Sequence, residues 1–157
     1  MSKSKVVIVV CKDYDGDKVY KAISDGLNAL GGISTFISHE EKILVKPNFL
    51  SPAEAEKVIT TNPAVIKAVC RILSEQGYHN IKVGDSPAHG SCRSAFDKLN
   101  LNEGDLSGAV IADMSKEKLV SFPEGKTCKN FYYAEEVTEA DAIIGLKRIV
   151  TNCRWGT

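Results

Sequence analysis

Short runs of consecutive apolar residues alternate along the chain with segments in which apolar residues recur at helical spacing. The first run, residues 5–11, contains five consecutive β-branched residues. An unbroken run of this kind is typical of a strand buried on both faces, as in a parallel sheet covered by helices. Further runs predict core strands at residues 42–46, 80–84, 108–112 and 142–146.

Residues that favour helix ends flank the segments with helical spacing. Asp15 is placed to cap the first helix and Gly31 to end it. Asn62 followed by Pro63 predicts the start of a second helix, and Gly77 predicts its end. Shorter helices are predicted at residues 91–99 and 134–140.

The alternation of strands and helices indicates an α/β protein. We expect an open, mainly parallel sheet with right-handed crossovers and helices on both faces, a Rossmann-like three-layer arrangement. Residues 1–157 are expected to form a single domain. Residues 118–122 and 127–133 fit either a strand pair or an irregular excursion. The last strand leads into no further helix, so we expect the sequence to be part of a longer protein.

Composition narrows the class of partner. The chain has 20 Lys and Arg against 20 Asp and Glu, so it lacks the basic field of a dedicated nucleic-acid or membrane-surface binder. Its N-terminus also lacks the apolar stretch of a signal peptide. We therefore expect a cytoplasmic protein with neither nucleic acid nor membrane as partner. Its five cysteines form no C-x-x-C pair, so no zinc or iron–sulfur motif is predicted in this chain.

Cationic residues follow two of the predicted strands. Open parallel sheets bind ligands outside the carboxyl ends of their strands. Lys46 ends one strand because Pro47 follows it, and Asn48 adds an amide that both donates and accepts hydrogen bonds. Lys147 and Arg148 follow the last strand. These residues predict a pocket for an anion, with a proline-terminated strand and solvated lysines as the alternative.

The loop at residues 84–91 is a second candidate. Its small residues let the backbone approach a ligand, and the N–H groups near Ser91 at a helix start suit a phosphate or carboxylate. Asp85 and Ser86 are expected to line the site, and His89 is the candidate for proton transfer. An ordinary strand–turn–helix connection capped by Ser91 is the alternative. The loop matches neither the P-loop nor the dinucleotide motif, so no nucleotide is implied.

Three motifs in order carry a resemblance to a known family. They are K-P-N-F at residues 46–49, T-N-P-A-V-I-K-A-V at 61–69 and G-D-S-P at 84–87. The sequence resembles the domain of unknown function 362 family over nearly its whole length. Many longer members carry a ferredoxin-like module, so the resemblance implies iron–sulfur clusters in those relatives and no cofactor in this chain. The family pattern after the last strand has a proline where this chain has Lys147, and a histidine where it has Asn152.

The leading hypothesis is a domain that binds a small anionic metabolite at the carboxyl ends of its strands. The predicted ligand-binding residues are Lys46, Asn48, Asp85, Ser86, Ser91 and Arg148. Whether the domain is an enzyme is left open; in a catalytic reading, His89 transfers the proton. Replacing Lys46 by methionine is expected to abolish binding with little change in melting temperature. The alternative is a scaffold for an iron–sulfur electron-transfer protein whose cluster module is absent here.

Overall fold

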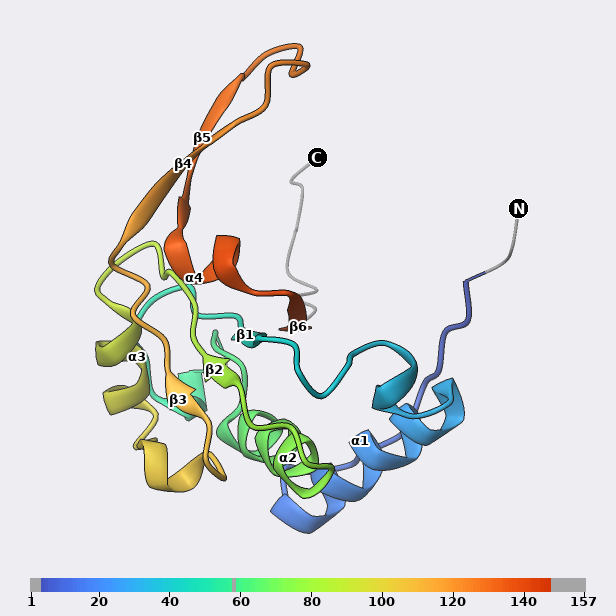
Figure 1. Cartoon of the computed structure of the whole chain (residues 1–157). Coiled ribbons are helices and arrows are strands. Elements are labelled where there is room, and N and C mark those ends of the chain that lie inside the picture. Colours follow the sequence, from blue (N-terminus) through green and yellow to red (C-terminus); the bar gives the residue numbers. More distant parts are fainter. Residues whose placement is uncertain (1–3, 58, 148–157) are drawn as a thin grey trace, which may run out of the picture.

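A computed structural model describes residues 4–57 and 59–147 (Figure 1). Its main sheet has four strands in the order β3-β2-β1-β6, and every neighbouring pair is parallel. The strands are β1 (Ile43–Pro47), β2 (Ile81–Val83), β3 (Val110–Ile111) and β6 (Ala142–Leu146). The α/β class and the parallel sheet predicted from the alternation of strands and helices are confirmed.

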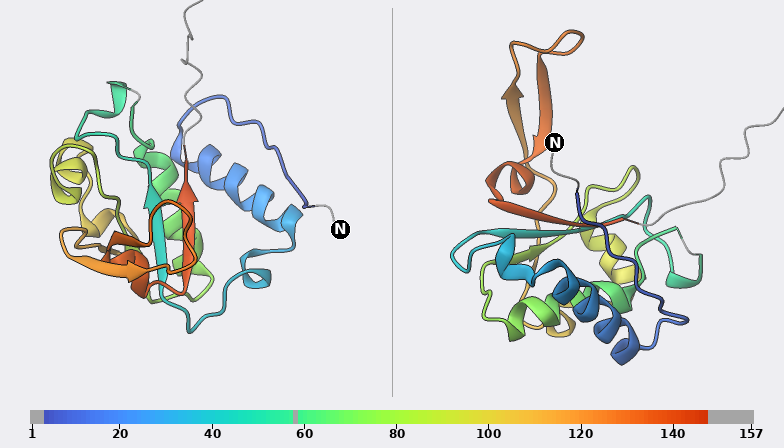
Figure 2. Two further views of the ribbon diagram at one scale, coloured as in Figure 1. Left: turned by 90° about the horizontal axis from the view of Figure 1, so that it is seen from above. Right: turned by 90° about the vertical axis from the view of Figure 1, so that its right-hand side faces the viewer.

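Helices lie on both faces of this sheet (Figure 2). One face carries α1 (Gly16–Leu30), α2 (Pro63–Glu75) and α3 (Cys92–Lys98), and the opposite face carries α4 (Glu135–Glu139). Three short 3₁₀ turns complete the helical elements: η1 (Ile33–Thr35), η2 (Ala55–Lys57) and η3 (Glu103–Asp105). Both connections β1–α2–β2 and β2–α3–β3 advance in one direction across the sheet.

Side-chain caps explain where the two long helices begin. The Asp15 side chain accepts a hydrogen bond from the Lys18 N–H at 3.1 Å, and the Asn62 side chain accepts one from the Ala64 N–H at 2.9 Å. Each bond satisfies a backbone donor that has no partner within its helix. Gly31, with a φ of 106°, ends α1 in the left-handed conformation. These predicted boundaries are confirmed.

Residues of the sheet alternate between a buried face and a partly open one. Lys82 forms an ion pair with Glu136 of α4 at 2.6 Å, so its side chain lies on the α4 face. Its neighbours Ile81 and Val83 point to the other face, where they are 4% and 0% exposed. Ile143 and Lys82 are both register partners of Leu44, so Ile143 also faces the α4 side of the sheet, where it is 49% exposed. The core therefore lies between the sheet and α1, α2 and α3.

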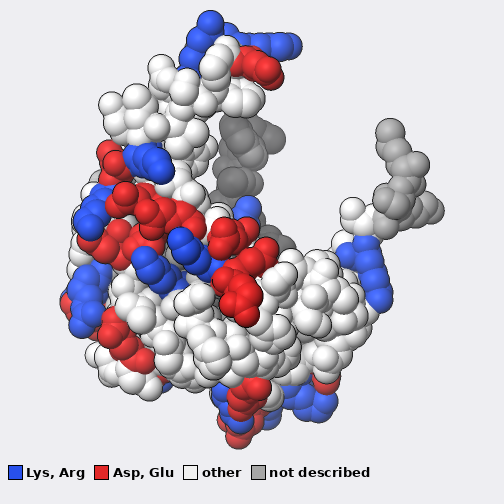
Figure 3. Space-filling model, viewed as in Figure 1, with Lys and Arg blue, Asp and Glu red and all other residues white. Residues whose placement is uncertain are grey.

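A two-stranded antiparallel hairpin projects from the sheet (Figure 1). Its strands are β4 (Glu117–Ser121) and β5 (Asn130–Ala134). The strand pair, rather than the irregular excursion, is thus the correct alternative for this region. Charged side chains of both signs are interspersed on the face that Figure 3 shows, in keeping with the net charge of zero.

The core strand predicted at residues 5–11 is not formed in this structure. This segment belongs to no strand, and Val6 and Ile8 are 80% and 89% exposed. It lies along α1, where a Cβ placed on Gly26 would come within 3.5 Å of the Val9 side chain. A β-branched run favours extended backbone, but a strand also needs a hydrogen-bonding neighbour. No strand of the described residues supplies one here.

Candidate functional site

One buried carboxylate joins the carboxyl ends of β1 and β2. Asp85 lies two residues after β2 and is only 5% exposed. Its Oδ2 accepts a hydrogen bond from the Phe49 N–H at 2.7 Å, and its Oδ1 accepts one from the Lys46 ammonium. Hydrogen bonds to an ionised carboxylate are stronger than those between neutral groups. Asp85 therefore fixes the loop after β1 and holds the Lys46 ammonium at the edge of the sheet.

This pairing changes the expectation for Lys46. Substitution of Lys46 by methionine would leave the Asp85 carboxylate buried without its cation. Removing one partner of such a pair is destabilising because the remaining charge is left uncompensated. The melting temperature of that variant is therefore expected to fall, contrary to the expectation from the sequence.

A second junction, at Thr61, ties the loop after β1 to the end of β6. The buried Thr61 hydroxyl accepts a hydrogen bond from the Asn48 N–H at 2.8 Å and donates one to the Leu146 carbonyl at 2.7 Å. The Thr61 N–H donates to the Asn48 carbonyl at 3.1 Å. Sequence analysis did not single out Thr61 as a site residue. The sequence feature that could have identified it is its place as the first residue of the T-N-P motif, directly before the helix cap Asn62.

Glycines in the loop at residues 84–91 are required by packing against the protein itself. A Cβ on Gly84 would lie 2.8 Å from the Ala112 Cβ, and one on Gly90 would lie 2.6 Å from the Pro52 side chain. Gly90 also has a φ of 78°, in the left-handed region. The small residues of this loop therefore allow its backbone to pack closely against other parts of the protein, which explains them without a ligand.

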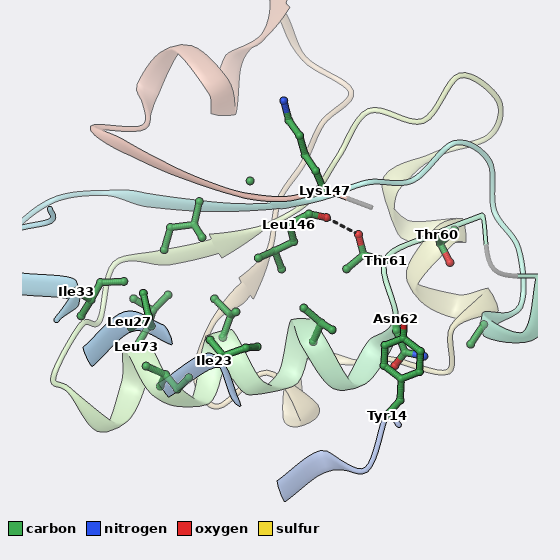
Figure 4. Close-up of a pocket in the computed structure, with 16 residues that line it drawn as sticks. Tyr14, Ile23, Leu27, Ile33, Thr60, Thr61, Asn62, Leu73, Leu146 and Lys147 are labelled. Carbon is green, nitrogen blue, oxygen red and sulfur yellow. Dashed lines mark hydrogen bonds between the residues drawn. The ribbon is translucent and has the colours of Figure 1, made fainter. Parts of the chain in front are cut away.

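Two lysines flank an open position on the α4 face of the sheet. Lys46 is the register partner of Gly145, so their Cα positions face the same side. Lys147 lies two residues after Gly145 and points away from the pocket beneath the sheet (Figure 4). A Cβ on Gly145 would meet no atom within 4 Å. The side chain of Lys46 is 40% exposed, and Lys147 is exposed with no ion pair among the described residues.

The remaining predicted residues take separate positions. Ser86 and His89 are exposed, and no hydrogen bond within the described part of the chain joins either side chain to Lys46 or Asp85. The Ser91 hydroxyl accepts from the Ser94 N–H at 3.1 Å, and the Ser91 N–H donates to the Ser94 hydroxyl at 2.9 Å. The N–H groups of Ser91 and Ser94 are therefore already used in capping α3. Arg148 lies outside the described residues.

Asp113 is the other aspartate that follows a strand of the sheet. Its Oδ1 accepts hydrogen bonds from the Ser115 hydroxyl at 2.5 Å and from the Ser115 N–H at 3.1 Å. These bonds hold the pKa of Asp113 below its usual value. The side chain is exposed and closes a local turn.

A pocket of about 610 Å³ lies beneath β6, between that strand and helices α1 and α2 (Figure 4). Its lining is mainly aliphatic and includes Ile23, Leu27, Val65, Val69, Ile144 and Leu146. Thr60, at the end nearest the K-P-N-F loop, is 3% exposed, and its hydroxyl has no hydrogen-bond partner among the described residues. The pocket is thus apolar along its length and polar at one end.

Two described cysteines, Cys70 and Cys92, are buried. Burial raises the pKa of the Cys70 thiol to about 12 and also raises that of Cys92. Within residues 4–57 and 59–147, no group of three or more His, Cys, Asp or Glu side chains gathers as a metal would require. Both thiols are therefore placed as small apolar side chains of the core.

Comparison with known proteins adds the family. Residues 43–153 match the family described as domain of unknown function, DUF362. The chain belongs to this family. The match begins at β1 and includes all three motifs on which the resemblance rested, from K-P-N-F to G-D-S-P.

A curated relative extends the similarity beyond the family match. A thylakoid-associated protein from Synechocystis sp. is 25% identical over 155 residues, which cover 95% of this chain and 46% of the relative. The chain thus spans about half the length of that protein. No solved structure matches. None of the described helices is long and apolar enough to cross a membrane.

Proposed function

We propose that this member of the family binds a small phosphate- or carboxylate-bearing anion at the carboxyl edge of its sheet, between Lys46 and Lys147. The observation that supports it is the placement of both lysines next to the open position at Gly145: Lys46 is the register partner of Gly145 on β1, and Lys147 follows two residues later. Ligands of open parallel sheets bind at this edge. Lysine ammonium groups act as compact positive charges toward such anions.

The pairing of Lys46 with Asp85 supports the proposal in a second way. The carboxylate is buried, so it holds the Lys46 ammonium in position before any ligand arrives, while 40% of the lysine side chain stays exposed. A positioned group loses less conformational entropy on binding than a free one. Asp85 neutralises one of the two cations, and Lys147 contributes the positive charge that attracts the ligand.

The expected contribution of each lysine follows from hydrogen-bond energetics. A hydrogen bond to a charged group contributes about 1.5–3 kcal/mol, and about 1.4 kcal/mol corresponds to a tenfold change in affinity. Loss of one lysine therefore weakens binding by roughly tenfold to a hundredfold. Asn48, Ser86 and Arg148 remain predicted ligand contacts, and proton transfer by His89 remains a prediction.

The test is a calorimetric titration of the full chain with inorganic phosphate. Saturable binding is expected for the unaltered chain, with affinity reduced at least about tenfold in Lys147→Met. Lys129→Met is the matched control, because Lys129 is an exposed lysine next to β5 on the distant hairpin. Equal affinities for all three proteins, or no saturable binding by the unaltered chain, would count against the proposal.

Lys46 needs a variant that spares the fold. The double substitution Lys46→Met with Asp85→Asn removes the ammonium without leaving a buried unpaired carboxylate. Its amide oxygen can still accept the Phe49 N–H. This variant is expected to keep a cooperative melting transition and to lose phosphate affinity. Unchanged affinity in a folded double variant would exclude Lys46 from the site.

The anion site bears on neither the cellular location of the protein nor the electron-transfer alternative. Cytoplasmic location is still a prediction, as is the absence of nucleic-acid and membrane partners. No observation on the described residues favours the scaffold for an iron–sulfur module over the anion site.

A further inference from the structure

The sheet has an open edge and the chain has an unpaired apolar segment beside it. Among the described strands, β6 pairs only with β1, and no described strand bonds to the N–H and C=O groups on its other side. Residues 5–11 are apolar and β-branched, yet they belong to no strand. We propose that residues 5–11 move onto the free edge of β6 as a fifth parallel strand.

The pocket beneath β6 is the space that such a strand would fill. Its volume is about 610 Å³, and aliphatic side chains of β6, α1 and α2 form most of its wall. Strand residues point alternately to the two faces, so every second residue of the segment would enter this pocket. Val9 and Cys11 already line an adjoining hollow together with Ile23 and Val65, which also line the pocket.

The segment already runs in the direction that the sheet requires. The Lys5 ammonium donates a hydrogen bond to the Ala29 carbonyl near the end of α1, whereas Cys11 lies beside Val19 near its start. The segment is therefore antiparallel to α1, as a strand that precedes a crossover helix must be. The proposed move is therefore a sideways displacement about residues 12–15, with no reversal of chain direction.

The handedness of the resulting connection also agrees. From a position beyond β6, the path through α1 to β1 advances in the same direction as β1–α2–β2 and β2–α3–β3. Helices α1, α2 and α3 lie on the same face (Figure 2). All three connections would then have one hand, and about 98% of such parallel crossovers are right-handed.

Hydrogen exchange of the full chain, followed by mass spectrometry, tests this inference. A seated strand predicts that a peptide covering residues 5–11 exchanges at least about tenfold more slowly than an unstructured segment. It also predicts protection of those N–H groups of residues 142–146 that face away from β1, beyond the protection that β1 already gives. Exchange of residues 5–11 at the unstructured rate would overturn the proposal.

Two neighbouring proline substitutions, Val7→Pro and Ile8→Pro, make the test specific for a strand. Neighbouring N–H groups of a strand point to opposite sides, and proline is tolerated only where the N–H faces away from the ladder. One variant is expected to restore fast exchange in residues 5–11 while the other retains slow exchange there. Equal behaviour of the two variants would overturn the proposal.

The same experiment separates other occupants of the edge. Protection that disappears on dilution, together with a dimer in size-exclusion chromatography, would assign the edge to a second copy and overturn the intramolecular strand. Protection of those N–H groups of residues 142–146 that face away from β1, with residues 5–11 exchanging freely, would assign the edge to a different occupant and overturn the proposal as well.

Discussion

Replacement of Asp85 by alanine is expected to destabilise the fold, although Asp85 lies at the candidate site. The Phe49 N–H, on a residue only 2% exposed, would lose its acceptor. An unsatisfied buried donor costs about 1–3 kcal/mol. The lost Lys46 ion pair adds at most about 1 kcal/mol, because that lysine is exposed enough for water to solvate its ammonium. We expect a total loss of about 1–4 kcal/mol in the free energy of unfolding, with a middle value of about 2.5 kcal/mol.

Thermal unfolding followed by circular dichroism measures this loss. For a chain of this size, about 1 kcal/mol shifts the melting temperature by roughly 2–4 °C, so Asp85→Ala should lower it by roughly 5–10 °C. Asp113→Ala is the matched control. Asp113 lies two residues after β3 as Asp85 does after β2, but it is exposed and bonds only within its own turn. Melting temperatures of the two variants within about 2 °C of each other would refute the reasoning.

Further predictions concern burial. Because burial raises the pKa of Cys70 to about 12, its thiol should resist iodoacetamide in the native chain while exposed Cys128 is alkylated; peptide mapping that shows equal modification would contradict this. Gly84→Ala should lower the urea midpoint, since overpacking costs about 1–3 kcal/mol, whereas Gly145→Ala should leave it nearly unchanged because its Cβ meets nothing within 4 Å. Burial raises the pKa of the Tyr78 phenol, so the unfolded state releases that proton first and stability should fall as the pH rises above about 10. Tyr78→Phe should flatten this part of the profile of unfolding free energy against pH, and an unchanged slope would contradict the assignment.

Local signals carried most of what the sequence could predict. A cap depends on residues within about four positions of one another, and Asp15, Asn62 and Ser91 all cap helices where they were expected to. The four strands of the main sheet were predicted as well, because each is a short apolar run bounded by turn residues. The position of the candidate site followed from the ends of those strands.

Long-range partners could not be predicted in the same way. The hydrogen bond between Lys46 and Asp85 spans 39 positions, and that between Thr61 and Leu146 spans 85. Spacing along the chain contains no information about such pairs. The sequence therefore predicted Asp85 as a ligand contact, whereas in the structure it anchors the loop after β1. The strand predicted at residues 5–11 differs from the structure for a related reason, since composition specifies an extended backbone but not the neighbouring strand with which it pairs.

The residues around Lys46 and those around Lys147 differ in how freely they can be substituted as the family diverges. Asp85 is buried and anchors the loop after β1, so a substitution there disturbs folding before it can alter ligand preference. Gly145 and Lys147 are exposed at the end of β6, where new side chains meet open space. Specificity can therefore drift on the β6 side while the β1 and β2 side stays fixed. The proposed anion binding therefore predicts that relatives with different ligands differ first at the residues corresponding to Gly145 and Lys147.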